Sequence, residues 1–152
     1  MKVGIDVHGV IDKFPKQFSL LTNYWVHTCG HEVHILTGSP WDKAIGKLNN
    51  IAYTHHLSIV DHHASIATPM ELRSNGWWMS EVAWNRTKGD YATKVGLSIH
   101  FEDTLAYAPW FPSSCMFIHV GQSRNGVFSA LEDFVKLFVG KTVDTAFGIS
   151  GG

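Results

Sequence analysis

The sequence predicts an α/β fold in which helices cover both faces of a mostly parallel five-stranded sheet. Short apolar runs rich in β-branched residues alternate along the chain with longer segments whose apolar residues recur at helical spacing. Glycines at positions 30 and 96 directly follow two of the helical segments, where they are suited to end a helix. This alternation is typical of βαβ units and predicts three layers, α/β/α.

The expected strands and helices follow one another in a regular order. The strands are the β-rich runs at residues 2–6, 33–36, 57–60, 97–101 and 116–120. The helices are the segments with apolar residues every three or four positions, at residues 14–28, 41–55, 81–95 and 127–139. The remaining chain contains no linker-like stretch and no internal repeat, so we expect residues 1–152 to form a single domain.

One segment interrupts the alternation between the third strand and the third helix. It contains Pro69 and the pair Asn75-Gly76, which favours a tight hairpin turn. We therefore expect a small insertion or flap at about residues 62–82. The adjacent Trp77 and Trp78 are interpreted as packing residues that cover the edge of the sheet, with contact at the mouth of a site as the alternative.

Composition excludes several classes of protein. The chain has 12 Lys and Arg residues against 13 Asp and Glu, and this balance lacks the basic excess of a dedicated nucleic-acid binder. A small phosphorylated substrate remains compatible with it. No apolar run approaches the ~20 residues of a membrane span. Asp6 interrupts any signal-peptide core, and the widely spaced Cys29 and Cys115 suggest free thiols, so we expect a cytoplasmic protein.

Polar side chains follow three of the expected strands at the point where each ends. Asp6 follows the first strand, Thr37 the second, and Glu102 and Asp103 the fourth. The carboxyl ends of parallel strands meet at one edge of a sheet, where ligands bind in open α/β folds. Lys88 lies in the helix that leads into the fourth strand, from which it can point toward the same edge. The sequence therefore predicts one site built from these side chains.

These residue types suit phosphoryl transfer. Asp6 could attack phosphorus and form an aspartyl-phosphate. Because a carboxylate and a phosphate repel one another, a cation must offset the charge, and Mg²⁺ with its preference for oxygen ligands suits that need. We expect the Thr37 hydroxyl, the Gly38 backbone N–H and the Lys88 ammonium to hold the phosphate oxygens.

The motifs resemble those of the haloacid dehalogenase (HAD) superfamily of aspartate-nucleophile phosphatases. The run DVHGVI at residues 6–11 is similar to the first motif, Asp-x-Asp-Gly-[Val/Thr]-[Ile/Leu], and HILTG at residues 34–38 to the second. Lys88 corresponds to the lysine of the third motif, and Glu102-Asp103 to the acidic pair of the fourth. The resemblance covers residues 2–104 in the family's order. It implies a Rossmann-like domain that hydrolyses phosphate monoesters with Mg²⁺ bound by Asp6, residue 8, Glu102 and Asp103.

The sequence departs from the family pattern at position 8. The family has an aspartate there that serves as general acid and base, and this chain has His8. A histidine, with an ordinary pKa of roughly 6.5, can carry protons near neutral pH and could replace that carboxylate. Alternatively, the site is impaired and the domain acts as a binding or interaction module, or the imidazole supports a different reaction. The family also binds Mg²⁺ through the main-chain oxygen of this position, and that oxygen is present whatever the side chain is.

Two of these assignments, those of Thr37 and Lys88, have alternatives. Thr37 could cap the helix expected to begin near Trp41. Lys94 competes with Lys88 for the lysine of the third motif, although Lys88 lies at the family's distance from the acidic pair. Asp103 is expected to be the direct metal ligand, with Glu102 beside it.

The paired histidines are interpreted as loop or surface residues. His55-His56 and the run DHH at residues 61–63 suggest zinc sites, and the latter resembles the DHH phosphoesterases over three residues alone. The companion aspartate motifs of those enzymes are not evident. A metal site at these histidines is therefore not the favoured reading.

The lengths between motifs limit the kind of substrate. One helix fills residues 12–32, and residues 61–87 provide enough chain for a flap, so no large cap domain is expected. The site is then open to larger phosphorylated substrates, or closed by a neighbouring subunit in a homo-oligomer. The opening at residues 6–11 also resembles that of deoxyribonucleotidases. We therefore expect a Mg²⁺-dependent phosphate monoester hydrolase, with a nucleotide as one candidate substrate.

Overall fold

A five-stranded parallel sheet forms the centre of the protein, as a computed structural model that describes residues 1–121 shows. The strand order is β3-β2-β1-β6-β7, and each neighbouring pair is parallel. The strands are β1 (Lys2–Asp6), β2 (Glu32–Thr37), β3 (His55–Ser58), β6 (Ile99–Glu102) and β7 (Met116–His119). The predicted α/β class with its five parallel strands is confirmed.

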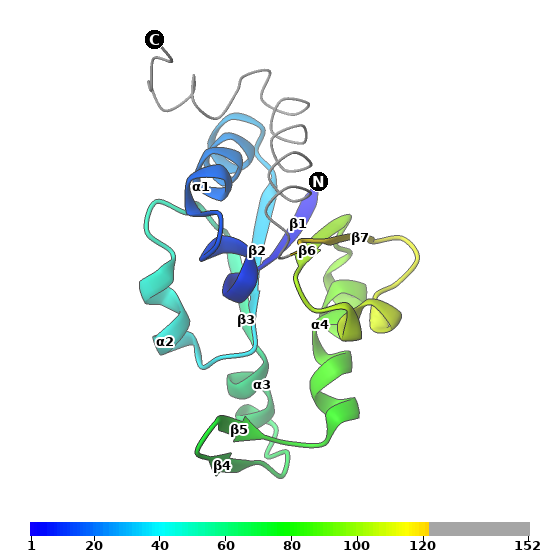
Figure 1. The fold of residues 1–152 in the computed structure, drawn as a ribbon. Helices are drawn as coiled ribbons and strands as arrows, with labels where there is room; N and C mark the ends of the chain where they lie inside the picture. The colour runs from blue at the N-terminus through cyan, green and yellow to red at the C-terminus, as the bar shows by residue number, and fades with distance from the viewer. Residues whose placement is uncertain (122–152) are drawn as a thin grey trace.

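Helices lie on both faces of the sheet (Figure 1). The long ones are α1 (Pro15–Asn23), which continues into the π-helical turn η2 (Tyr24–Thr28), and α4 (Glu81–Val95). The short ones are η1 (Val7–Ile11), α2 (Trp41–Ala44), η3 (Ile45–Lys47), α3 (Ile59–Ser65) and η4 (Leu105–Trp110). Among the described residues, no helix combines the length and the hydropathy needed to cross a membrane.

Two apolar clusters define the layers. Successive side chains of a strand point to opposite faces of the sheet. Ile5 and Ile35 therefore share one face, where they pack in a cluster with Phe18 and Leu21 of α1. On the opposite face, Leu36 belongs to a second cluster that includes Ala92 of α4 and Leu97. The chain is thus a three-layer, Rossmann-like α/β/α fold.

Two predicted elements differ from the structure around β3. The helix expected at residues 41–55 is shorter in the structure. The helical segment of α2 and η3 ends before Leu48, and Asn50 adopts a left-handed conformation (φ 61°). The strand expected at residues 57–60 lies at His55–Ser58 instead, and α3 follows at once. The Ser58 hydroxyl accepts a hydrogen bond from the Asp61 backbone N–H (3.1 Å) and so caps α3. The helix predicted at residues 127–139 lies outside the described residues.

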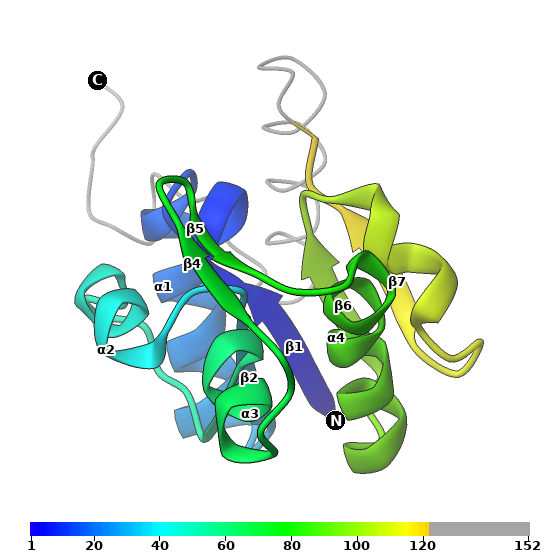
Figure 2. The same cartoon turned by 90° about the horizontal axis from the view of Figure 1, so that it is seen from below.

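The predicted flap is a small antiparallel hairpin. Its strands are β4 (Glu71–Arg73) and β5 (Gly76–Trp78), and they pair through Arg73 opposite Gly76. Gly76 has a φ of 116°, a conformation that glycine adopts at little cost. The hairpin lies across the end of the molecule toward which β1 points (Figure 2). It therefore stands at the carboxyl ends of the strands, where the site was predicted.

Candidate active site

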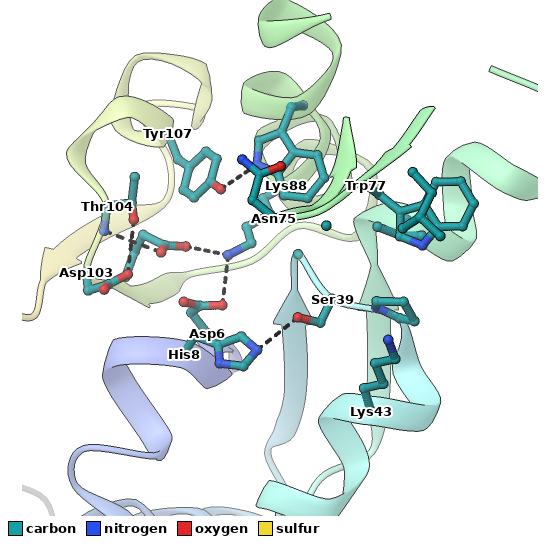
Figure 3. Close-up of a pocket in the computed structure, with 17 residues that line it drawn as sticks. Asp6, His8, Ser39, Lys43, Asn75, Trp77, Lys88, Asp103, Thr104 and Tyr107 are labelled. Atoms are coloured by element: carbon teal, nitrogen blue, oxygen red, sulfur yellow. Dashed lines mark hydrogen bonds and ion pairs between the residues drawn. The ribbon is translucent and has the colours of Figure 1, made fainter. Parts of the chain in front are cut away.

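A buried ammonium group joins the ends of β1 and β6. These strands are parallel neighbours, so their last residues, Asp6 and Glu102, lie side by side. Lys88 reaches them from the middle of α4, and its Nζ donates to Asp6 Oδ1 (2.9 Å) and to Glu102 Oε2 (2.7 Å) (Figure 3). All three residues are at least 96% buried. Lys94, the competing lysine, is exposed, so Lys88 is the lysine of this site.

The charges of this trio are unequal, because one ammonium faces two carboxylates. Burial and, to a smaller extent, the Glu102 carboxylate raise the pKa of Asp6, the attraction of Lys88 opposes them, and the net pKa is about 6. The pKa of Glu102 is also raised, mainly by burial. Burial alone would lower the pKa of Lys88, but the two carboxylates outweigh it and raise that pKa. Lys88 therefore stays charged, and the trio carries an excess of negative charge when both carboxylates are ionised.

A buried histidine supports Glu102 from the same strand. His100 lies two residues before Glu102, on the same face of β6, and its Nε2 is 3.1 Å from Glu102 Oε2. Burial, together with the charge of Lys88, lowers the pKa of His100 to about 3. The neutral ring therefore donates its Nε2–H to Glu102. Sequence reasoning missed His100, although the two-residue spacing from Glu102 on a strand was a usable signal.

Asp103 completes a cluster of three carboxylates. Its side chain lies directly against the backbone of Gly9, where any Cβ would overlap the Asp103 carboxylate. Gly9 also has a φ of 76°, so a larger side chain would be strained there as well as blocked. One carboxylate oxygen each of Asp6, Glu102 and Asp103 lies within 4.8 Å of the others.

The donor chemistry of this cluster fits Mg²⁺. All three side chains offer carboxylate oxygens, the ligands that this ion prefers. With Lys88 as the neighbouring cation, three carboxylates leave two negative charges uncompensated when all are ionised. A divalent cation would balance that charge.

The His8 side chain lies beside this cluster in a network of its own. Its Nε2 is 2.9 Å from Ser39 Oγ, and its Nδ1 is 3.0 Å from Lys47 Nζ and 3.6 Å from Asp12 Oδ2. Asp12 is held in turn by the Gly9 backbone N–H, which donates to its Oδ1 (2.7 Å). The Lys47 ammonium can only donate, so Nδ1 accepts and the proton of the neutral ring is on Nε2, facing Ser39.

Thr37 and Gly38 occupy different positions at the end of β2. Thr37 is fully buried, and its hydroxyl accepts a hydrogen bond from the Ser39 backbone N–H (3.2 Å), so it lies beneath the cavity rather than in its wall. Gly38 lines the cavity, and the indole of Trp84 packs so closely on it that a Cβ would be crowded. The half-buried Ser39, which sequence reasoning missed, is the residue of this turn whose hydroxyl lines the cavity. Phosphate binding by Thr37 stays a prediction.

These residues surround a cavity of about 480 Å³. The predicted residues in its wall are Asp6, His8, Gly38, Lys88, Glu102 and Asp103. The hairpin contributes Leu72, Asn75 and Trp77 to the lining. Asn75 and Trp77 lie across the cavity from Asp6 and His8 (Figure 3). Trp84 and Tyr107 form an aromatic side of the cavity, joined by a hydrogen bond from Trp84 Nε1 to the Tyr107 hydroxyl (2.7 Å). The arrangement therefore combines a charged floor with aromatic walls.

The histidines of the run DHH lie away from this cavity, in α3. His62 is exposed, as expected. His63 is buried, and its ring nitrogens contact Thr68 Oγ1 (2.8 Å) and Thr87 Oγ1 (2.7 Å), so the interpretation as a loop or surface residue is wrong for it. The Thr87 contact joins α3 to α4, and the Thr68 contact joins α3 to the loop that follows it, which is a structural use of the ring.

Comparison with known proteins adds no name to this site: no protein-family model matches the chain, and no curated protein matches it significantly.

Proposed function

We propose that this protein is a Mg²⁺-dependent phosphate monoester hydrolase with Asp6 as its nucleophile. The observation that carries the proposal is the buried Lys88, which bridges Asp6 and Glu102 next to a third carboxylate, Asp103. Evolved sites rarely bury such an excess of negative charge without a use for it. The order of the sequence motifs, which resembles that of the HAD superfamily, supports the same reading.

The proposed reaction begins at the end of β1. An oxygen of Asp6 attacks phosphorus, the bond from phosphorus to the leaving-group oxygen breaks, and an aspartyl-phosphate forms. Water then attacks this phosphorus and releases inorganic phosphate, which regenerates the Asp6 carboxylate. Mg²⁺, held by Asp6, Asp103 and the main-chain oxygen of His8, would offset the charge of the phosphate during both steps.

The neighbouring side chains prepare the nucleophile and the substrate. Lys88 keeps its charge and opposes the rise in the pKa of Asp6, so that Asp6 is mostly ionised near neutral pH. The Gly38 N–H and the Ser39 hydroxyl are available at the cavity for phosphate oxygens. His8, also in the cavity wall, would protonate the leaving group and later accept a proton from water.

The hydrogen bonds of His8 favour a second candidate function. In the network described above, both ring nitrogens are engaged, with Nδ1 against the Lys47 ammonium and Nε2 against Ser39 Oγ. With both nitrogens engaged by these groups, neither one faces the leaving group or the attacking water. The alternative is therefore a catalytically impaired domain that binds a phosphorylated partner or acts as an interaction module.

The cavity also suggests a substrate class within the hydrolase proposal. Trp77 and Trp84 offer aromatic surface in the cavity wall and Asn75 offers an amide, while the Tyr107 ring lies beside the charged trio, 4.7 Å from Lys88 Nζ. A phosphate ester with a planar ring, such as a nucleotide, would place its phosphate on the charged floor and its ring against these walls.

The test is hydrolysis of a generic phosphate monoester in the presence of Mg²⁺. We expect measurable turnover by the native chain, loss of turnover in Asp6→Asn, and trapping of beryllofluoride on Asp6 of the native chain only. Asp42→Asn, at an exposed position in α2, is the matched control and should leave turnover unchanged. If the native chain is inactive and His8→Asp restores turnover, the impaired module is the correct reading and the hydrolase proposal is wrong.

A further inference from the structure

Three metal-binding side chains meet at the end of the sheet opposite the candidate active site. Glu32 and His34 stand two residues apart on β2, so they share one face, and His34 is the register partner of His55 on β3. One donor atom of each of the three side chains lies within 4.8 Å of the others. Thr37, at the other end of β2, marks the active-site edge, so this cluster is separate from the cavity around Asp6.

We propose that Glu32, His34 and His55 bind a transition-metal ion such as Zn²⁺. Two imidazoles and one carboxylate form a mixed nitrogen and oxygen donor set that suits Zn²⁺. Mg²⁺ prefers oxygen ligands alone, so the two ends of the sheet differ in the ion that they select. A water molecule would complete the tetrahedral coordination, because Glu32 and His55 are open to solvent.

His34 is already oriented for this task. It is 99% buried, its Nδ1 is 2.8 Å from the Tyr91 hydroxyl, and its Nε2 is 3.0 Å from Glu32 Oε2. The Tyr91 contact fixes the ring and directs Nε2 toward the carboxylate, as the outer hydrogen bonds of metal-bound histidines do.

The separation of these two donors matches what a shared ion requires. With metal–nitrogen and metal–oxygen bonds of about 2.0–2.2 Å and a tetrahedral angle, the two donor atoms lie roughly 3.3 Å apart. Nε2 of His34 and Oε2 of Glu32 are 3.0 Å apart. When an ion binds Nε2, the neutral ring carries its proton on Nδ1 instead and donates it to the Tyr91 oxygen. The two donor atoms then need to separate by only a few tenths of an ångström.

His55 needs a rotation to complete the site. Its ring is stacked on that of His34, with centroids 4.4 Å apart and an interplanar angle of 9°. Two stacked rings cannot both direct a nitrogen at one ion, so His55 must turn about its side-chain bonds. Its exposure permits this turn, which gives up the present contact of Nδ1 with Thr54 Oγ1 (2.8 Å).

One positive charge opposes binding. Lys2 Nζ lies 3.5 Å from Glu32 Oε2, and both side chains are about two-fifths exposed. An arriving cation competes with this ammonium for the same carboxylate. Lys2→Met should therefore tighten metal binding, a result that nonspecific binding to surface histidines would not give.

The experiment is a calorimetric Zn²⁺ titration of the full chain in excess Mg²⁺, which competes for the all-oxygen cluster but not for imidazoles. We expect Glu32→Gln and His55→Ala each to weaken Zn²⁺ binding by about tenfold or more. His56→Ala is the matched control, since His56 follows His55 on β3, points to the other face and stacks on Trp41 instead. Circular dichroism without metal checks that each variant is folded.

Two outcomes would overturn the proposal. If His56→Ala weakens binding as much as His55→Ala does, the ion is held by surface histidines in general. If neither Glu32→Gln nor His55→Ala changes the affinity, the ion is bound elsewhere on the chain. A Co²⁺-loaded sample gives an independent readout, because tetrahedral coordination produces strong visible absorption that should disappear in His55→Ala.

Discussion

The buried carboxylate of Asp6 should make the stability of the chain fall as the pH rises from about 4 to about 6. The pKa of Asp6 is raised from 3.8 to about 6 in the folded protein. Between these two pKa values the folded state binds more protons at Asp6 than the unfolded state does. The stability that Asp6 contributes is therefore fully present below the unfolded pKa and is lost as the pH rises through the folded pKa. A difference of about two pKa units corresponds to ~3 kcal/mol.

Asp6→Asn isolates this contribution, because the amide does not titrate. We expect the free energy of unfolding of the native chain, relative to that of the variant, to be ~2 kcal/mol lower at about pH 7 than at about pH 4, because pH 4 already lies just above the unfolded pKa. Urea unfolding followed by circular dichroism at each pH measures it. Asp42→Asn, at an exposed position, should parallel the native chain. Comparing each variant with itself at two pH values removes the constant loss of the hydrogen bond to Lys88.

Mg²⁺ extends the same prediction to the proposed metal site. Protons and Mg²⁺ compete for Asp6, so added Mg²⁺ should stabilise the native chain more at about pH 7 than at about pH 4. Asp6→Asn should lose most of this difference. If the native chain and Asp6→Asn keep parallel pH dependences, burial does not perturb Asp6 as the structure indicates, and the reasoning is refuted.

Two further substitutions test the neighbouring groups. Lys88→Met leaves two carboxylates buried without their cation and should cost about 3–5 kcal/mol of stability; Lys94→Met, at an exposed position of the same helix, should stay within ~0.5 kcal/mol, and equal effects would contradict the buried ion pairs. In steady-state assays, Trp77→Ala should raise KM for a nucleoside monophosphate but not for a small alkyl phosphate. Trp78→Ala, whose ring lies outside the cavity under Arg73, should change neither value.

The part of the site that lies on strand ends could be predicted from the sequence. Asp6 and Glu102 each follow an apolar run, and the rule that parallel strands end at one edge of the sheet brings them together. Lys88 was identifiable by its distance from the acidic pair, but its burial depends on how α4 packs against the sheet. Residues from the hairpin, such as Asn75, could not be placed, because no local pattern says where a flap lies.

The errors around β3 have a local cause. Ala44, Leu48 and Ile51 continue a helical spacing, which predicts one long helix, yet the chain turns at Asn50 with a positive φ. Periodicity reports which side chains are buried and not whether the backbone stays helical between them. Ser58 causes the error at the next boundary. Its side chain caps α3, so the strand ends at Ser58, two residues before its expected end at residue 60.

Whether His8 can act as a general acid depends on which group its Nδ1 contacts, Lys47 or Asp12. To protonate a leaving group, His8 must carry protons on both ring nitrogens, and Nδ1–H cannot face the Lys47 ammonium that it now accepts from. The Asp12 carboxylate, whose Oδ2 is 3.6 Å from Nδ1, could accept a hydrogen bond from the protonated Nδ1. Turnover through His8 therefore requires Lys47 to withdraw and Asp12 to take its place. The hydrolase and the impaired module thus differ by the position of one exposed lysine side chain rather than by the fold.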